Sequence, residues 1–123
     1  MLNFSVLTVG LAAAVGLWLA ILNLRARSAG AMPLSLAALH GVLAIIGFGV
    51  LIVALGGPPR GLSTGTASFG MIAAVALGLA ACVGFAMLAV HLRRRRVPGV
   101  VVGIHATLAV SGFVVLAVYA ILG

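Results

Sequence analysis

Four long apolar stretches dominate the sequence and restrict the folds that are open to it. They cover approximately residues 3–24, 34–55, 67–91 and 99–122, and short segments rich in Gly, Pro, Ser and Arg separate them. About 20 apolar residues suffice for a helix to cross the hydrocarbon core of a bilayer. Lipid tolerates only helices and closed barrels, and the alternating strands of a barrel are not visible here. Each stretch is therefore expected to be a transmembrane helix.

The charged residues narrow the function further. Of the 123 residues 65% are hydrophobic and 6% are charged, and Asp, Glu and Lys do not occur. The chain therefore lacks a carboxylate pair for acid–base catalysis, carboxylate ligands for hard metals and the membrane-embedded acid that proton-coupled small transporters use. We expect no independent catalytic activity, no nucleic-acid binding, and contact with membrane lipids.

Six of the seven arginines lie in two clusters between apolar stretches. Arg25 and Arg27 follow the first stretch, Arg93–Arg96 follow the third, and only Arg60 follows the second. The positive-inside rule predicts that both clusters are cytoplasmic and that both termini face the periplasm of a bacterial inner membrane. Because the basic residues follow the first apolar stretch instead of preceding it, that stretch is expected to be a retained helix and no signal peptide.

The second and fourth stretches are similar to each other. Residues 33–53 align on residues 98–118 with nine identities in 21 positions. Apolar composition does not explain the matches Pro33/Pro98, His40/His105, Gly47/Gly112 and Phe48/Phe113. At the same offset of 65 residues, the first and third stretches align much more weakly. We predict an all-α integral membrane protein: one four-helix domain over 1–123, an up-down bundle made of a tandem helical hairpin (roughly 1–58 and 66–123).

The repeated histidines are the main candidates for a functional site. Each lies seven residues after its proline, which is about 10 Å into a helix. In an up-down bundle the second and fourth helices are parallel and diagonal to each other, so that His40 and His105 are expected at matching depth. Gly47 and Gly112 follow seven residues later on the same helical face, where a flat ligand would need small residues.

This bundle plan and the repeated H-x6-G-F spacing resemble the four-helix haem-binding bundle of membrane b-type cytochromes. The resemblance implies that His40 and His105 are axial ligands of the iron of haem b, and that Gly47 and Gly112 line the ring. It also implies that the protein carries electrons within or beside a respiratory-type membrane complex. The haem propionates would find cationic partners among Arg25, Arg27 and Arg93, and a quinone is a further candidate partner.

Other interpretations of the histidines remain open at this point. They could form hydrogen bonds between helices in a cofactor-free accessory or assembly subunit of a larger complex, or in a homo-oligomer. They could also ligate separate chlorophyll-type pigments or face a partner subunit. A transporter is a third class, which the repeat favours and the missing acids disfavour. His91, whose counterpart at the offset of 65 is Ala26, is expected to be a solvated residue at the membrane interface, with proton entry or a quinone contact as the alternative.

Overall fold

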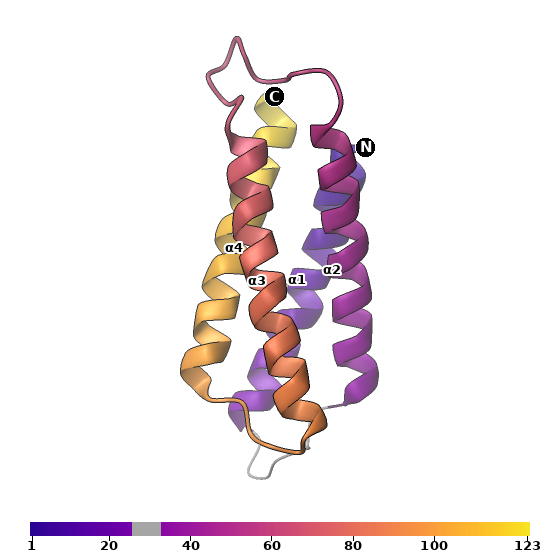
Figure 1. Ribbon diagram of the computed structural model, residues 1–123, viewed down its shortest axis with the longest axis vertical. Helices are drawn as coiled ribbons and strands as arrows, with labels where there is room; N and C mark the ends of the chain where they lie inside the picture. The colour runs from indigo at the N-terminus through magenta and orange to yellow at the C-terminus, as the bar shows by residue number, and fades with distance from the viewer. Residues whose placement is uncertain (26–32) are drawn as a thin grey trace.

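Four helices stand side by side along one axis and alternate in direction (Figure 1). The computed structural model describes residues 1–25 and 33–123. Within these ranges the helices are α1 (Leu2–Arg25), α2 (Leu34–Leu55), α3 (Phe69–Leu92) and α4 (Gly99–Leu122), and there is no strand. The predicted all-α fold is confirmed, and each helix begins and ends within two residues of its expected bounds.

Prolines mark the start of two helices. α2 begins directly after Pro33 and α4 directly after Pro98, with proline φ angles of −66° and −60°. The carbonyl of Pro33 accepts a hydrogen bond from the amide of Ala37, and that of Pro98 one from the amide of Val102, both at 3.2 Å. Each proline is the N-cap residue and has an extended backbone. Its missing N–H costs no helical hydrogen bond, because the first N–H groups of a helix have no partner within it.

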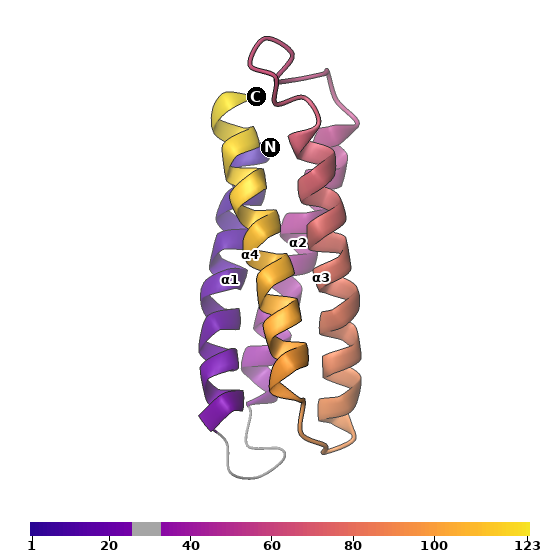
Figure 2. The ribbon, with the colours of Figure 1, turned by 90° about the vertical axis from the view of Figure 1, so that its left-hand side faces the viewer.

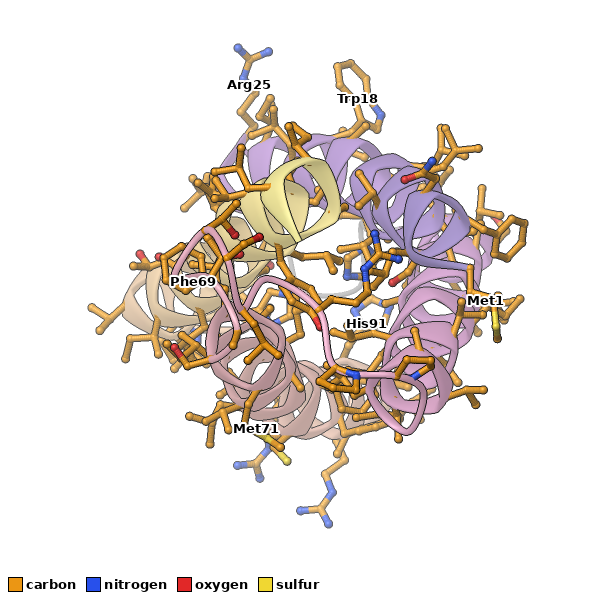
Figure 3. The ribbon with its side chains drawn as sticks, turned by 90° about the horizontal axis from the view of Figure 1, so that it is seen from above. Met1, Trp18, Arg25, Phe69, Met71 and His91 are labelled. Atoms are coloured by element: carbon orange, nitrogen blue, oxygen red, sulfur yellow. The ribbon has the colours of Figure 1, made fainter. Side chains whose placement is uncertain are left out.

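The outer surface of the bundle is apolar over most of its length. All four helices are long and apolar enough to cross a membrane. Large apolar side chains are exposed on each of them, among them Trp18, Ile45, Phe85 and Val114. Trp18 points away from the bundle in the end-on view of Figure 3. Such a continuous apolar exterior would associate or aggregate in water but matches a lipid environment. The chain is therefore a membrane protein.

The helices are arranged as a square. Each helix packs against the two that flank it, whereas the backbones of the diagonal pairs α1/α3 and α2/α4 do not come close to each other. The pairs α1/α2 and α3/α4 pack more closely than the two hairpins pack against each other. Both side views place the two termini and the connection between α2 and α3 at one end of the bundle, with the connection between α3 and α4 at the other (Figures 1 and 2).

The arginines are divided between these two ends. Arg25 ends α1 and Arg93–Arg96 follow α3, so they share one end, which we call the arginine end. Arg27 lies outside the described residues. At the opposite end, Arg60 donates to the carbonyl of Gly123 at 3.2 Å and Thr64 donates to the carbonyl of Leu122 at 2.9 Å. The connection between α2 and α3 is thereby fastened to the end of α4.

Candidate functional site

The two repeated histidines face each other inside the bundle. Counted from Leu34 and from Gly99, His40 and His105 are each the seventh residue of their helix. Their ring centroids are 6.0 Å apart, and the ring planes are inclined by 73°. The diagonal helices α2 and α4 therefore bring together two side chains that are 65 positions apart in the sequence. We call His40 and His105 the histidine pair.

Backbone carbonyls of the other two helices orient both imidazoles. Nδ1 of His40 lies 2.8 Å from the carbonyl oxygen of Ala12 in α1, and Nδ1 of His105 lies 2.9 Å from that of Ala80 in α3. A carbonyl oxygen only accepts hydrogen bonds, so each Nδ1 carries the proton and donates it. In the neutral ring Nε2 then holds a lone pair. A histidine that ligates a metal through one ring nitrogen usually donates a hydrogen bond from the other one, often to a backbone carbonyl.

A glycine beside each ring makes this arrangement possible. A Cβ atom at Gly16 would lie 2.7 Å from Cε1 of His40, and one at Gly84 would lie 3.2 Å from Cε1 of His105. Each glycine is four residues after the alanine whose carbonyl holds the histidine, and thus one turn along the same helix face. The absence of a side chain at Gly16 and Gly84 lets each imidazole lie directly against the neighbouring helix. We call these two positions the glycine seats.

The seats belong to a repeat that the offset of 65 residues conceals. At an offset of 68, residues 10–16 (GLAAAVG) match residues 78–84 (GLAACVG) at six of seven positions. The first and third stretches therefore align weakly at an offset of 65 because their own repeat has another register. The spacing from seat to histidine is 24 residues in the first hairpin (Gly16 to His40) and 21 in the second (Gly84 to His105). The connection between the two helices is thus three residues longer in the first hairpin, which accounts for the difference between the offsets of 65 and 68.

The same two offsets relate the contacts between the hairpins. Phe48 of α2 lies against Gly78 of α3, with its Cζ 3.5 Å from the position of a glycine Cβ. Phe113 of α4 lies against Gly10 of α1 in the equivalent way, at 3.3 Å from Cε2. The histidine pair therefore lies on a pseudo-twofold axis that relates the two hairpins.

Gly47 and Gly112 do not face the space between the histidines. A Cβ at Gly47 would lie 2.6 Å from Cγ2 of Val9 in α1, and one at Gly112 would lie 2.8 Å from Cγ of Leu77 in α3. Backbone amide nitrogens of Val9 and Leu77 are also close, at 3.1 Å in both cases. In this structure the two glycines allow neighbouring helices to approach closely. A role in lining a haem ring stays a prediction.

The remaining candidates lie at the arginine end. His91 is eleven residues beyond Ala80 on α3, about 16 Å along the helix axis, so it does not join the histidine pair. It is partly buried and lies inside the outline of the helices in Figure 3, whereas Arg25 points outward. At the offset of 68 its counterpart is Asn23, which corrects the assignment to Ala26, a residue outside the described part of the chain.

The donor set limits the kind of metal centre that the site could form. The described residues contain no group of three or more His, Cys, Asp or Glu side chains that could hold a metal ion. A structural zinc site takes four protein ligands and a catalytic one takes three. A haem iron needs only axial ligands from the protein, since the porphyrin supplies the others. Two imidazoles, each with one Nε2 lone pair, are enough donors for a haem iron and too few for zinc.

Fold and site together define an all-α membrane bundle with a histidine pair held by backbone carbonyls. Comparisons with known proteins add no family to this description: neither a protein-family model, nor a curated protein, nor a solved structure matches the chain.

Proposed function

We propose that the chain is a small membrane haem b protein that carries electrons within or beside a respiratory-type membrane complex. The observation that carries this proposal is the histidine pair, with each Nδ1 bonded to a carbonyl of the adjacent helix. His40 and His105 would hold the iron through Nε2. A haem with both axial positions filled by histidine supplies reversible one-electron transfer and no open position for oxygen.

The separation of the rings is compatible with one metal between them. An imidazole–metal bond is about 2 Å long, so two bonds account for about 4 Å, and the ring centroids are 6.0 Å apart. The remainder corresponds to the distance from each ring centre to its nitrogen. The inclination of 73° between the rings would not oppose ligation, because two imidazoles that bind one metal need not be coplanar.

The protein residues around the site have three tasks in this function. The backbone carbonyls of Ala12 and Ala80 accept hydrogen bonds from Nδ1–H of the histidines, which fixes the tautomer and makes Nε2 more basic. Gly16 and Gly84 leave room for the imidazoles. The site is surrounded mainly by apolar side chains, and low access of water would affect the reduction potential of a bound haem.

The first test is a dithionite-reduced minus oxidised absorption spectrum of the protein purified in mild detergent after expression with added haem precursor. The expected result is the sharp α and Soret bands of a six-coordinate haem b, at about one haem per chain because there is one histidine pair. Extraction of the haem and its pyridine derivative give the haem type. A featureless spectrum from folded protein would contradict the proposal.

The alternative is a cofactor-free accessory or assembly subunit, with membrane subunits of a larger complex or a second copy as partner. It is favoured by the fact that Nδ1 of each histidine already has a partner within the chain. Under this alternative the pair holds α1 to α2 and α3 to α4. Histidine substitutions would then weaken association with the partner and leave every spectrum unchanged.

We further propose that the arginine end is cytoplasmic and that both termini are periplasmic, in a bacterial inner membrane. The support is the division of charge, with Arg25 and Arg93–Arg96 at one end and Arg60 at the other, because basic residues are retained on the cytoplasmic side. In a Cys82→Ala background, a membrane-impermeant maleimide should label Arg60→Cys in intact spheroplasts and should label Arg95→Cys only after lysis. The reverse pattern would invert the topology.

A further inference from the structure

The histidine pair lies well to one side of the membrane-spanning part. His40 and His105 are six residues, about 9 Å, from the first residues of α2 and α4. On the other two helices Gly16 and Gly84, which contact the rings, are nine residues, about 14 Å, from Arg25 and Arg93. The pair is therefore about 9 to 14 Å from the arginine end. Another 15 residues of α2 and 17 of α4 follow the histidines (40 to 55, 105 to 122), which is about 22 to 26 Å to the opposite end. Because electron tunnelling slows steeply with distance, exchange across the short side is strongly favoured.

The long side of the bundle is filled with protein. Beyond the histidines, Gly47 packs onto Val9 and Gly112 onto Leu77, with no room for a further methyl group. Leu51 and Leu116 then follow on α2 and α4, both with 0% exposure. The third histidine of the chain is His91, which belongs to the arginine end. In the part of the chain that the structure describes, the interior of the long side therefore has no imidazole and is closely packed between the helices.

The arginine end is an ordered cationic surface. Arg25 and Arg93–Arg96 are exposed there, and the sequence has no Asp or Glu that could neutralise them. The turn after α3 is fixed by hydrogen bonds from the amide of Arg94 to the carbonyl of His91 at 2.9 Å and from the amide of Arg95 to the carbonyl of Val90 at 3.2 Å. Arg94 has a φ of 53° in this turn.

From these three observations we infer that electrons enter and leave the site only through the arginine end, and that the partner there is a one-electron redox protein with an acidic docking surface. The inference rests on the proposed haem function. One electron leaves the reduced partner and converts the ferric haem to the ferrous state, or passes in the opposite direction to an oxidised partner. A cationic surface raises the association rate of an acidic partner by about 10- to 1,000-fold at low ionic strength, and salt reduces this gain.

The test is the rate of haem reduction by a reduced acidic [2Fe–2S] ferredoxin, measured by anaerobic stopped flow. Haem-loaded protein is placed in phosphatidylcholine nanodiscs, which leave both ends accessible. The wild-type rate should fall by about tenfold between low and physiological salt. The variant Arg93→Gln/Arg95→Gln should be slower by about threefold at low salt and should depend less on salt than the wild type, because Arg25, Arg94 and Arg96 remain. The matched control Arg60→Gln removes a charge from the opposite end and should leave the rate unchanged.

Several outcomes would overturn the inference. One is an equal rate for Arg93→Gln/Arg95→Gln and wild type, and another is a slower rate for Arg60→Gln. A third is a loss of the arginine dependence when phosphatidylglycerol is included in the nanodiscs, which would show that anionic lipid headgroups occupy this end. Haem content and the dithionite-reduced spectrum are recorded for each variant. Absence of haem from the wild type would contradict the haem function itself, which distinguishes the two failures.

Discussion

Replacement of either His40 or His105 by alanine should abolish haem retention. The site has two protein donors and no third His, Cys, Asp or Glu near them among the described residues, so nothing is available to take over the lost axial position. The expected result is a fall from about one haem per chain to near zero in protein expressed with added haem precursor. The measurement is the ratio of the Soret absorbance to protein concentration after purification.

The fold itself should survive these substitutions. Each variant loses one hydrogen bond, from Nδ1 of the histidine to the carbonyl of Ala12 or Ala80. Such bonds between membrane helices contribute on average about 0.6 kcal/mol. Retained helix content by circular dichroism therefore separates loss of the ligand from loss of the bundle. His91→Ala is the matched control, because this histidine lies about 16 Å along α3 from Ala80, the residue whose carbonyl binds His105. Full haem in both His40→Ala and His105→Ala would show that the ligand assignment is wrong.

The fold was predictable because each step of the prediction depends on a strong physical constraint. Runs such as 34–55 are too long and too apolar for any element but a membrane helix, and Pro33 and Pro98 fix where two helices begin. The pairing of His40 with His105 followed from their equal depth on parallel helices, and the structure brings the two rings together.

The surroundings of the histidines were harder to predict. Their partners are the backbone carbonyls of Ala12 and Ala80. Because every residue has a carbonyl, the type of a residue does not reveal that its carbonyl is such a partner. The seats Gly16 and Gly84 did leave a signal, the heptapeptides GLAAAVG and GLAACVG. That signal appears only at an offset of 68 residues, because the two hairpins have connections of different length.

The glycines Gly47 and Gly112 show a second limit of prediction from helical periodicity. A spacing of seven residues places a glycine on the same face as its histidine, but it does not say which neighbour that face meets at each level. At the level of the histidine the face meets the partner imidazole and a glycine seat. Two turns further it meets the backbone of α1 or α3, at Val9 and Leu77.

The second large effect is expected at these close approaches. In Gly47→Ala the new methyl group would lie 2.7 Å from Oγ1 of Thr8 and 3.1 Å from the backbone nitrogen of Val9. A side chain could rotate away, but the backbone of α1 can move only as a whole helix. Overpacking of this kind costs about 1–3 kcal/mol. Gly112→Ala meets the same obstacle at the backbone nitrogen of Leu77, at 3.1 Å, and should have an effect of similar size.

Gly49→Ala is a matched control for Gly47→Ala, since it lies on the same helix and its methyl group would meet no atom within 4 Å. Gly103→Ala serves in the same way for Gly112→Ala on α4. Because alanine favours a helix over glycine by about 1 kcal/mol, both controls should be neutral or slightly stabilising. The measurement is the unfolding midpoint in a titration of dodecyl maltoside micelles with sodium dodecyl sulfate, with haem content recorded in parallel. Equal midpoints for Gly47→Ala and Gly49→Ala, together with loss of haem from Gly47→Ala alone, would show instead that this glycine lines the ring.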